Sequence, residues 1–137
     1  MSDLSKLVQI YGLSLTAQII FNFFNFYILF SRIKFANYHV PLIGTFDSLW
    51  KFVIAAWLFN APMYICGTIL VGYAYRLSVL NFEGMYLAFI GGQISSVLTS
   101  ILFIWLTAGE IPNRNGWIAI ALVFLASFFA AHSSKPV

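Results

Sequence analysis

The sequence predicts an all-α integral membrane protein, a four-transmembrane-helix antiparallel bundle that forms a single membrane domain over residues 1–137. Apolar residues make up 61% of the chain and charged residues only 8%, whereas about a quarter of a soluble domain is charged. The mean hydropathy is +0.90. The apolar runs are continuous and lack the alternation of a membrane β-barrel. This composition excludes a soluble enzyme, a disordered chain and a nucleic-acid binder.

The four spans follow from the rule that roughly 20 apolar residues cross a hydrocarbon core of about 30 Å. The first covers about 7–30, the second about 52–75, the third about 84–108 and the fourth, which is the shortest, about 115–131. The connection over 35–51 is the long one, and its Pro41-Leu42-Ile43-Gly44 segment predicts a turn. The other connections are short, which predicts antiparallel neighbours with both termini on one side.

Positive charge leaves the orientation open, because the two sides of the predicted bundle carry similar numbers of cations. The side of the termini carries Lys6, Arg76 and Lys135, and the opposite side carries Arg32, Lys34, Lys51 and Arg114. In one interpretation the charges that follow the first span place that end in the cytoplasm. In the other, the chain inserts in both orientations and forms an antiparallel pair.

The first span carries a polar stripe. Ser14, Gln18, Asn22 and Asn25 follow one another at steps of four, four and three residues, which places them on one face of an α-helix. An unpaired carboxamide in hydrocarbon costs several kcal/mol, so the stripe must face other helices or a wet cavity. It fits either the wall of a pathway for polar groups or a set of interhelical hydrogen bonds that hold the bundle together.

The second span contains Asn60 two residues before Pro62. Proline lacks an N–H, so a carbonyl one turn earlier loses its partner and the helix is expected to kink. The Asn60 side chain is able to satisfy such loosened backbone. A packing kink and a gating hinge both fit this pattern, and Asn60 is counted among the candidate pathway residues.

The third span predicts a surface for helix packing or dimer contact. Gly91 with Ser95, and Gly92 with Ser96, are pairs of small residues four positions apart, and Thr99 continues the face that begins with them. Small residues at this spacing let two helix backbones approach closely.

The chain lacks the residue patterns of catalysis and metal binding. One cysteine and two distant histidines offer no metal-ligand spacing, and no nucleophile–base arrangement or phosphate-binding loop is present. We therefore expect no catalytic residues, no metal, no cofactor and no enzymatic activity. A proton-coupled carrier usually needs an ionisable group within the membrane, and the strongest candidate position holds Gln18, which cannot titrate.

Several segments resemble the small multidrug resistance proteins and the four-helix (EamA-like) members of the drug/metabolite transporter superfamily. Gly109-Glu110, a short polar turn and the apolar segment from Gly116 to Leu122 are similar to their junction between helices three and four. Residues 85–92 resemble their third helix. Ala17-Gln18 falls where their first helix has an Ala-Glu or Gly-Gln element.

This resemblance implies a dimer in the bacterial inner membrane, with the first-helix stripe lining a shared chamber and with Gln18 and Tyr86 near it. The multidrug exporters carry a membrane-embedded Glu where this chain has Gln18. Relatives without that Glu include subunits that move lipid-linked sugars. The implied function is therefore a small multi-pass transporter or lipid-linked-sugar flippase, working as a dimer without a first-helix carboxylate for proton coupling.

An accessory or structural subunit of a larger membrane complex is the alternative, and in that case the amides of the stripe only hold helices together. The expected partners are membrane lipid and either a second small membrane protein, identical or different, or a larger membrane complex. No nucleic-acid partner is expected.

Overall fold

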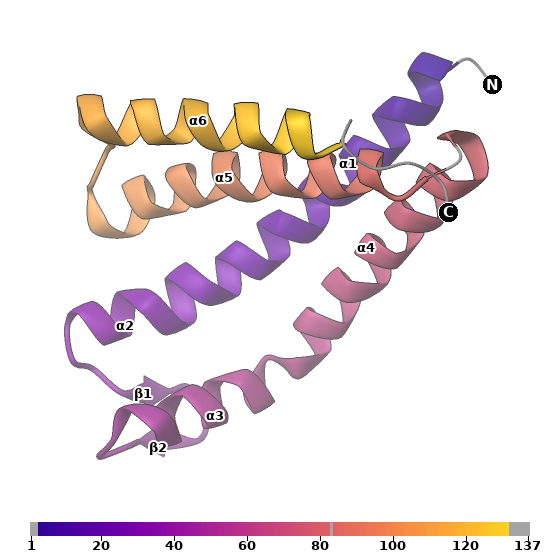
Figure 1. Ribbon diagram of the computed structural model, residues 1–137. Coiled ribbons are helices and arrows are strands. Elements are labelled where there is room, and N and C mark those ends of the chain that lie inside the picture. Colours follow the sequence, from indigo (N-terminus) through magenta and orange to yellow (C-terminus); the bar gives the residue numbers. More distant parts are fainter. Residues whose placement is uncertain (1–2, 83, 132–137) are drawn as a thin grey trace.

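The computed structural model describes residues 3–82 and 84–131, most of them in helices (Figure 1). The first helical segment is continuous and comprises α1 (Asp3–Asn22), the π-helix η1 (Phe23–Phe30) and α2 (Ser31–Lys34). A short antiparallel hairpin of β1 (His39–Val40) and β2 (Gly44–Thr45) follows, with the predicted turn at its tip. The remaining helices are α3 (Leu49–Phe59), α4 (Ala61–Phe82), α5 (Tyr86–Ala108) and α6 (Arg114–Ala131).

Among the described residues, three helices are long and apolar enough to cross a membrane. They are Asp3–Lys34, Ala61–Phe82 and Tyr86–Ala108. Two more apolar helices, Leu49–Phe59 and Arg114–Phe129, are shorter. Many large apolar side chains are exposed, for example Ile69 and Trp105, each about half exposed (53%). Spanning-length helices with apolar outer surfaces are compatible with a membrane protein.

The predicted second span over 52–75 is not one helix, and this prediction is corrected. The chain breaks at Asn60, and the helix of spanning length is Ala61–Phe82. The Asn60 side chain donates a hydrogen bond to the Ala56 carbonyl over 2.9 Å, which closes the end of α3. Pro62 then lies in the first turn of α4, where its missing N–H leaves no helical bond unmade. Hydropathy alone does not predict this break, because the residues on both sides of Asn60 are apolar.

α1 lies at the centre of the helix packing. It contacts α4 and α5 extensively, while α6 makes its principal contacts with α5 (Figure 1). α5 and α6 run antiparallel, side by side, and α1 passes across α5. The packed unit is therefore formed by α1, α4 and α5, and α6 is added to it through α5.

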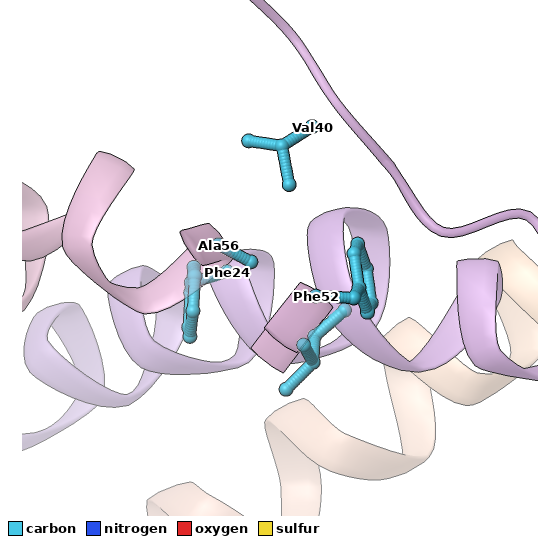
Figure 2. Close-up of a cluster of buried hydrophobic side chains, with 5 residues drawn as sticks. Phe24, Val40, Phe52 and Ala56 are labelled. Carbon is cyan, nitrogen blue, oxygen red and sulfur yellow. The ribbon is translucent and has the colours of Figure 1, made fainter. Parts of the chain in front are cut away.

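Two small apolar cores lie at opposite ends of α1 and its continuation. Near the N-terminus, Ile10 packs with Ala74 of α4 and Ala88 of α5. At the other end, η1 packs against α3 and the hairpin, through the buried residues Phe24, Leu29, Val40, Phe52 and Ala56 (Figure 2). The segment between these two cores carries Ser14, Gln18 and Asn22 of the polar stripe.

Candidate functional site

Successive turns of α1 present Ser14, Gln18 and Asn22 toward α5. Ser14 and Asn22 are buried, and Gln18 is half-buried. Gln18 is about 20 Å along the helix axis from the charged residues Asp3 and Arg32, at 1.5 Å per residue. The three polar side chains therefore lie near the middle of the apolar part of this segment.

Asn22 makes a hydrogen bond between two helices. Its side-chain Nδ2 donates to the Thr99 Oγ1 on α5 over 2.5 Å and lies 3.5 Å from the Ser96 carbonyl oxygen. The Thr99 hydroxyl in turn donates to the Ser95 carbonyl over 2.7 Å. The amide of Asn22 thus has a protein partner, which is what the packing interpretation of the stripe requires.

A close approach of α1 and α5 lies one to two turns away, at Gly91. A Cβ atom built on Gly91 would lie 2.7 Å from the Tyr11 ring, so the ring occupies the space that any side chain would need. Ser95 and Thr99, on the same face of α5, are buried. This face, Gly91 with Ser95 and Thr99, is the one that packs on α1.

The neighbouring face of α5 does not pack tightly but lines a cavity of about 150 Å³. Three helices contribute to its wall. From α1 come Ser14 and Gln18, one turn apart, and from α4 come Val71 and Tyr75, also one turn apart. α5 supplies residues at helical spacing: Ala88, Phe89, Gly92, Gln93 and Ser96. The cavity is therefore formed at the junction of α1, α4 and α5.

The cavity wall is polar although all three helices are apolar. Gln18, Gln93, Ser14, Ser96 and Tyr75 each bring a hydrogen-bonding group to it. Among the described residues, no Asp, Glu, Lys, Arg or His lines it. Within the described chain the carboxamides of Gln18 and Gln93 make no hydrogen bond, in contrast to that of Asn22. Such groups in an apolar layer need water or a ligand as partner.

Three predicted pathway residues lie elsewhere. Asn25 belongs to η1, in which the Ser31 N–H bonds to the Phe26 carbonyl five residues back. Each residue of a π-helix turns the chain through a smaller angle than in an α-helix, so the α-helical spacing that aligned Asn25 with the stripe does not apply. The structure gives Asn25 no place in the cavity wall.

Asn60 and Tyr86 are also outside the cavity. Asn60 is buried at the end of α3, bonded to the Ala56 carbonyl. Tyr86, at the start of α5, is 41% exposed, and its ring packs edge-on to Phe89, which does line the cavity. The structure therefore brings Ser14 and Gln18 together with Asn22 beside them, but not the other three.

Gln93 and Tyr75 also line the cavity, although neither was predicted from the sequence as a site residue. Phe89, Gly92, Gln93 and Ser96 follow the spacing 0, +3, +4 and +7, the pattern of one helix face. Gln93 lies among the small residues of the predicted packing surface in the sequence, and their spacing obscures this second face. One feature of the sequence could have identified Gln93. It is the one carboxamide between residues 84 and 108, and Gln18 is likewise a carboxamide within the first span.

The predicted packing residues divide between these two faces. Gly91, Ser95 and Thr99 contact α1 or are buried against it, whereas Gly92 and Ser96 border the cavity. A Cβ atom on Gly92 would have no atom within 4 Å. The small residues of α5 thus serve close packing on one side and leave open volume on the other.

One set of charged groups lies where α2, the hairpin and the turn between α5 and α6 meet. Lys34 Nζ lies 2.7 Å from Glu110 Oε1, which connects the end of α2 to the turn between α5 and α6. Lys51 pairs with Asp47 over 3.3 Å, and Arg32 donates to the His39 carbonyl. Of the cations used to judge orientation, Lys135 lies outside the described residues.

The chain matches no family model, and no curated protein or solved structure matches it.

Proposed function

We propose that the chain is a small multi-pass membrane transporter, or a protein similar to the lipid-linked-sugar flippases, that works as a dimer without a first-helix carboxylate for proton coupling. The observation that supports this most directly is the polar cavity at the junction of α1, α4 and α5, with Gln18 and Gln93 in its wall. Carboxamides and hydroxyls in the middle of an apolar helix bundle lower the cost of moving a polar group through it.

The absence of Asp, Glu and His from the described cavity wall supports transport without a titrating group on the first helix. Proton relays in transporters use such side chains within the membrane. In this proposal the protein moves its substrate down a concentration gradient, or a partner protein supplies the energy for transport.

The proposed dimer is supported by the small size of the cavity in one chain. A volume of about 150 Å³ holds about five water molecules at ~30 Å³ each. That space covers only a small part of a bilayer crossing. A second copy, with its own cavity facing the first, would extend the polar route, as the resemblance to dimeric small transporters implies.

The test is a lipid-transport assay in vesicles that contain the purified protein and a fluorescent NBD-labelled glucosyl lipid. Dithionite added outside destroys only the label in the outer leaflet unless lipid crosses. We expect the wild type to expose the inner-leaflet label, and the Gln18→Leu/Gln93→Leu variant to lose this activity. Thr16→Val is the matched control, because Thr16 is exposed on α1 outside the cavity wall and bonds only to its own helix. No transport by the wild type, or full transport by the double variant, would contradict the proposal.

An accessory subunit of a larger complex is the second candidate, and the exposure of α6 favours it. Trp117, Leu122 and Phe129 are each more than half exposed, and no large apolar side chain of α6 is buried within the described residues. Native mass spectrometry distinguishes the two: a particle of two copies supports the transporter, and a fixed assembly with other proteins supports the subunit.

A further inference from the structure

The cavity wall limits the chemistry of what it can bind. Its polar groups are two carboxamides, two serine hydroxyls and one phenol, each of which can both donate and accept a hydrogen bond. No Asp, Glu, Lys, Arg or His among the described residues lines it, so the wall offers a bound ion no side chain of opposite charge. Burying a charge without a partner is far more costly than burying a neutral polar group.

Gln18 and Gln93 are positioned to provide the binding groups. They project from different helices into the same space, and neither carboxamide has a hydrogen-bond partner within the described chain. Asn22, one turn from Gln18, shows the contrast, because Thr99 satisfies its amide. An amide that served only helix packing would need a protein partner, as Asn22 has, since an unpaired buried amide destabilises the fold.

The cavity is open to the surface of the molecule. Gln18, Gly92, Gln93 and Ser96 are all half-buried, so the wall is not sealed. Neighbouring apolar side chains on α1 and α5 are exposed: Leu15, Ile19 and Leu98. A ligand in the cavity would therefore lie beside exposed apolar surface.

We propose that this cavity binds the small, uncharged, hydroxyl-bearing headgroup of an amphiphile, of about the size of glycerol, within a single chain. The acyl chain stays outside against the apolar helix surface, and the headgroup exchanges hydrogen bonds with Gln18 and Gln93. This inference rests on the proposed function in using the same cavity, and it adds the charge and size of the ligand and the sufficiency of one protomer.

The test measures retention of three amphiphiles that share an oleyl-type chain and differ in headgroup charge. They are monoolein, oleyl sulfate and oleyltrimethylammonium, each added at the same mole fraction to protein in lauryldimethylamine oxide, a detergent without hydroxyl groups. Native mass spectrometry counts the molecules retained per chain. We expect one monoolein per chain, retained at least tenfold more than either charged amphiphile. Equal retention of all three would overturn the inference.

Variants locate the binding. Gln18→Leu and Gln93→Leu should each weaken monoolein retention about three- to tenfold, the effect of losing one hydrogen bond in a partly buried site. Ser96→Ala, which removes one hydroxyl and disturbs the fold least, should weaken it less. Thr16→Val is the control and should leave retention unchanged. Circular dichroism checks that each variant keeps its helices. Unchanged retention in both glutamine variants would overturn the inference.

Binding and transport are measured separately, so the two proposals fail in different ways. Selective monoolein retention without lipid transport in vesicles would contradict the proposed function and support the binding site. Transport that depends on Gln18 and Gln93, without selective retention of the neutral amphiphile, would support the function and overturn this inference about the ligand.

Discussion

α5 and α6 are neighbours in the sequence and pack against each other, yet they occupy different environments. α5 buries Ala88, Gly91, Ser95, Thr99 and Phe103 against the rest of the molecule. α6 is also apolar, but the one side chain buried among its described residues is Ser127, whose hydroxyl bonds to its own helix. Because both helices are apolar, apolarity does not distinguish the helix that packs inside from the one that lies outside. Small residues and interhelical hydrogen bonds make this distinction.

The largest expected effect comes from making the same substitution, Phe to Ala, on α5 and on α6. Phe103→Ala on α5 should destabilise the protein by about 3 kcal/mol, because a buried Phe loses its packing and leaves a cavity. The Phe103 ring lies 5.6 Å from that of Tyr27 and is 7% exposed. Phe129→Ala on α6, where the side chain is 63% exposed, should cost less than about 1 kcal/mol. Unfolding by denaturing detergent gives both free energies, and equal losses would show that α6 packs as α5 does.

A second expected effect tests the two faces of α5 with adjacent glycines. Gly91→Ala should destabilise by about 2 kcal/mol, since its Cβ atom would collide with the Tyr11 ring and the ring or the helices must move. Gly92→Ala is the matched control. Its new methyl group enters open space beside the cavity, so stability should change by less than about 0.5 kcal/mol. The same unfolding measurement applies, and a tolerated Gly91→Ala would refute the close α1–α5 contact.

The smallest expected effect concerns the interhelical hydrogen bond. Thr99→Val keeps the shape of the side chain but removes the acceptor of the Asn22 amide, and it should cost about 1–2 kcal/mol. The double variant Asn22→Leu/Thr99→Val should recover part of this loss, because no polar group is then left unpaired. A double-mutant cycle measures the coupling. Ser127→Ala on α6 removes a hydroxyl bonded within its own helix and serves as the control.

A large part of the helical organisation could be predicted from the sequence. The predicted spans over 7–30, 84–108 and 115–131 overlap helices in the structure, because charges and polar turns bound those apolar runs. The second span was predicted from hydropathy and was wrong in its limits. Its break depends on how Asn60 bonds to Ala56 and where Pro62 enters the next helix, and hydropathy does not measure either.

The candidate site could be predicted only in part. The spacing of Ser14, Gln18 and Asn22 predicted a common face, and these residues do lie together. Asn25 did not follow, because the helix widens into a π-helix at Phe23 and changes the angle between residues. The sequence also held Gln93 at a spacing that matched Gly92 and Ser96, but it gave no reason to join that face to Gln18.

The amino-acid sequence by itself determined the apolar helices and the polar face of the first one, since both follow from composition and from the 3.6-residue period of a helix. Only the tertiary structure decided which amide has a partner. Asn22 lies opposite Thr99 and is bonded, whereas Gln18 faces the cavity between α4 and α5 and has no hydrogen-bond partner among residues 3–82 and 84–131. The physical reason is that helical period fixes the direction of a side chain, while the crossing of neighbouring helices fixes what that side chain meets.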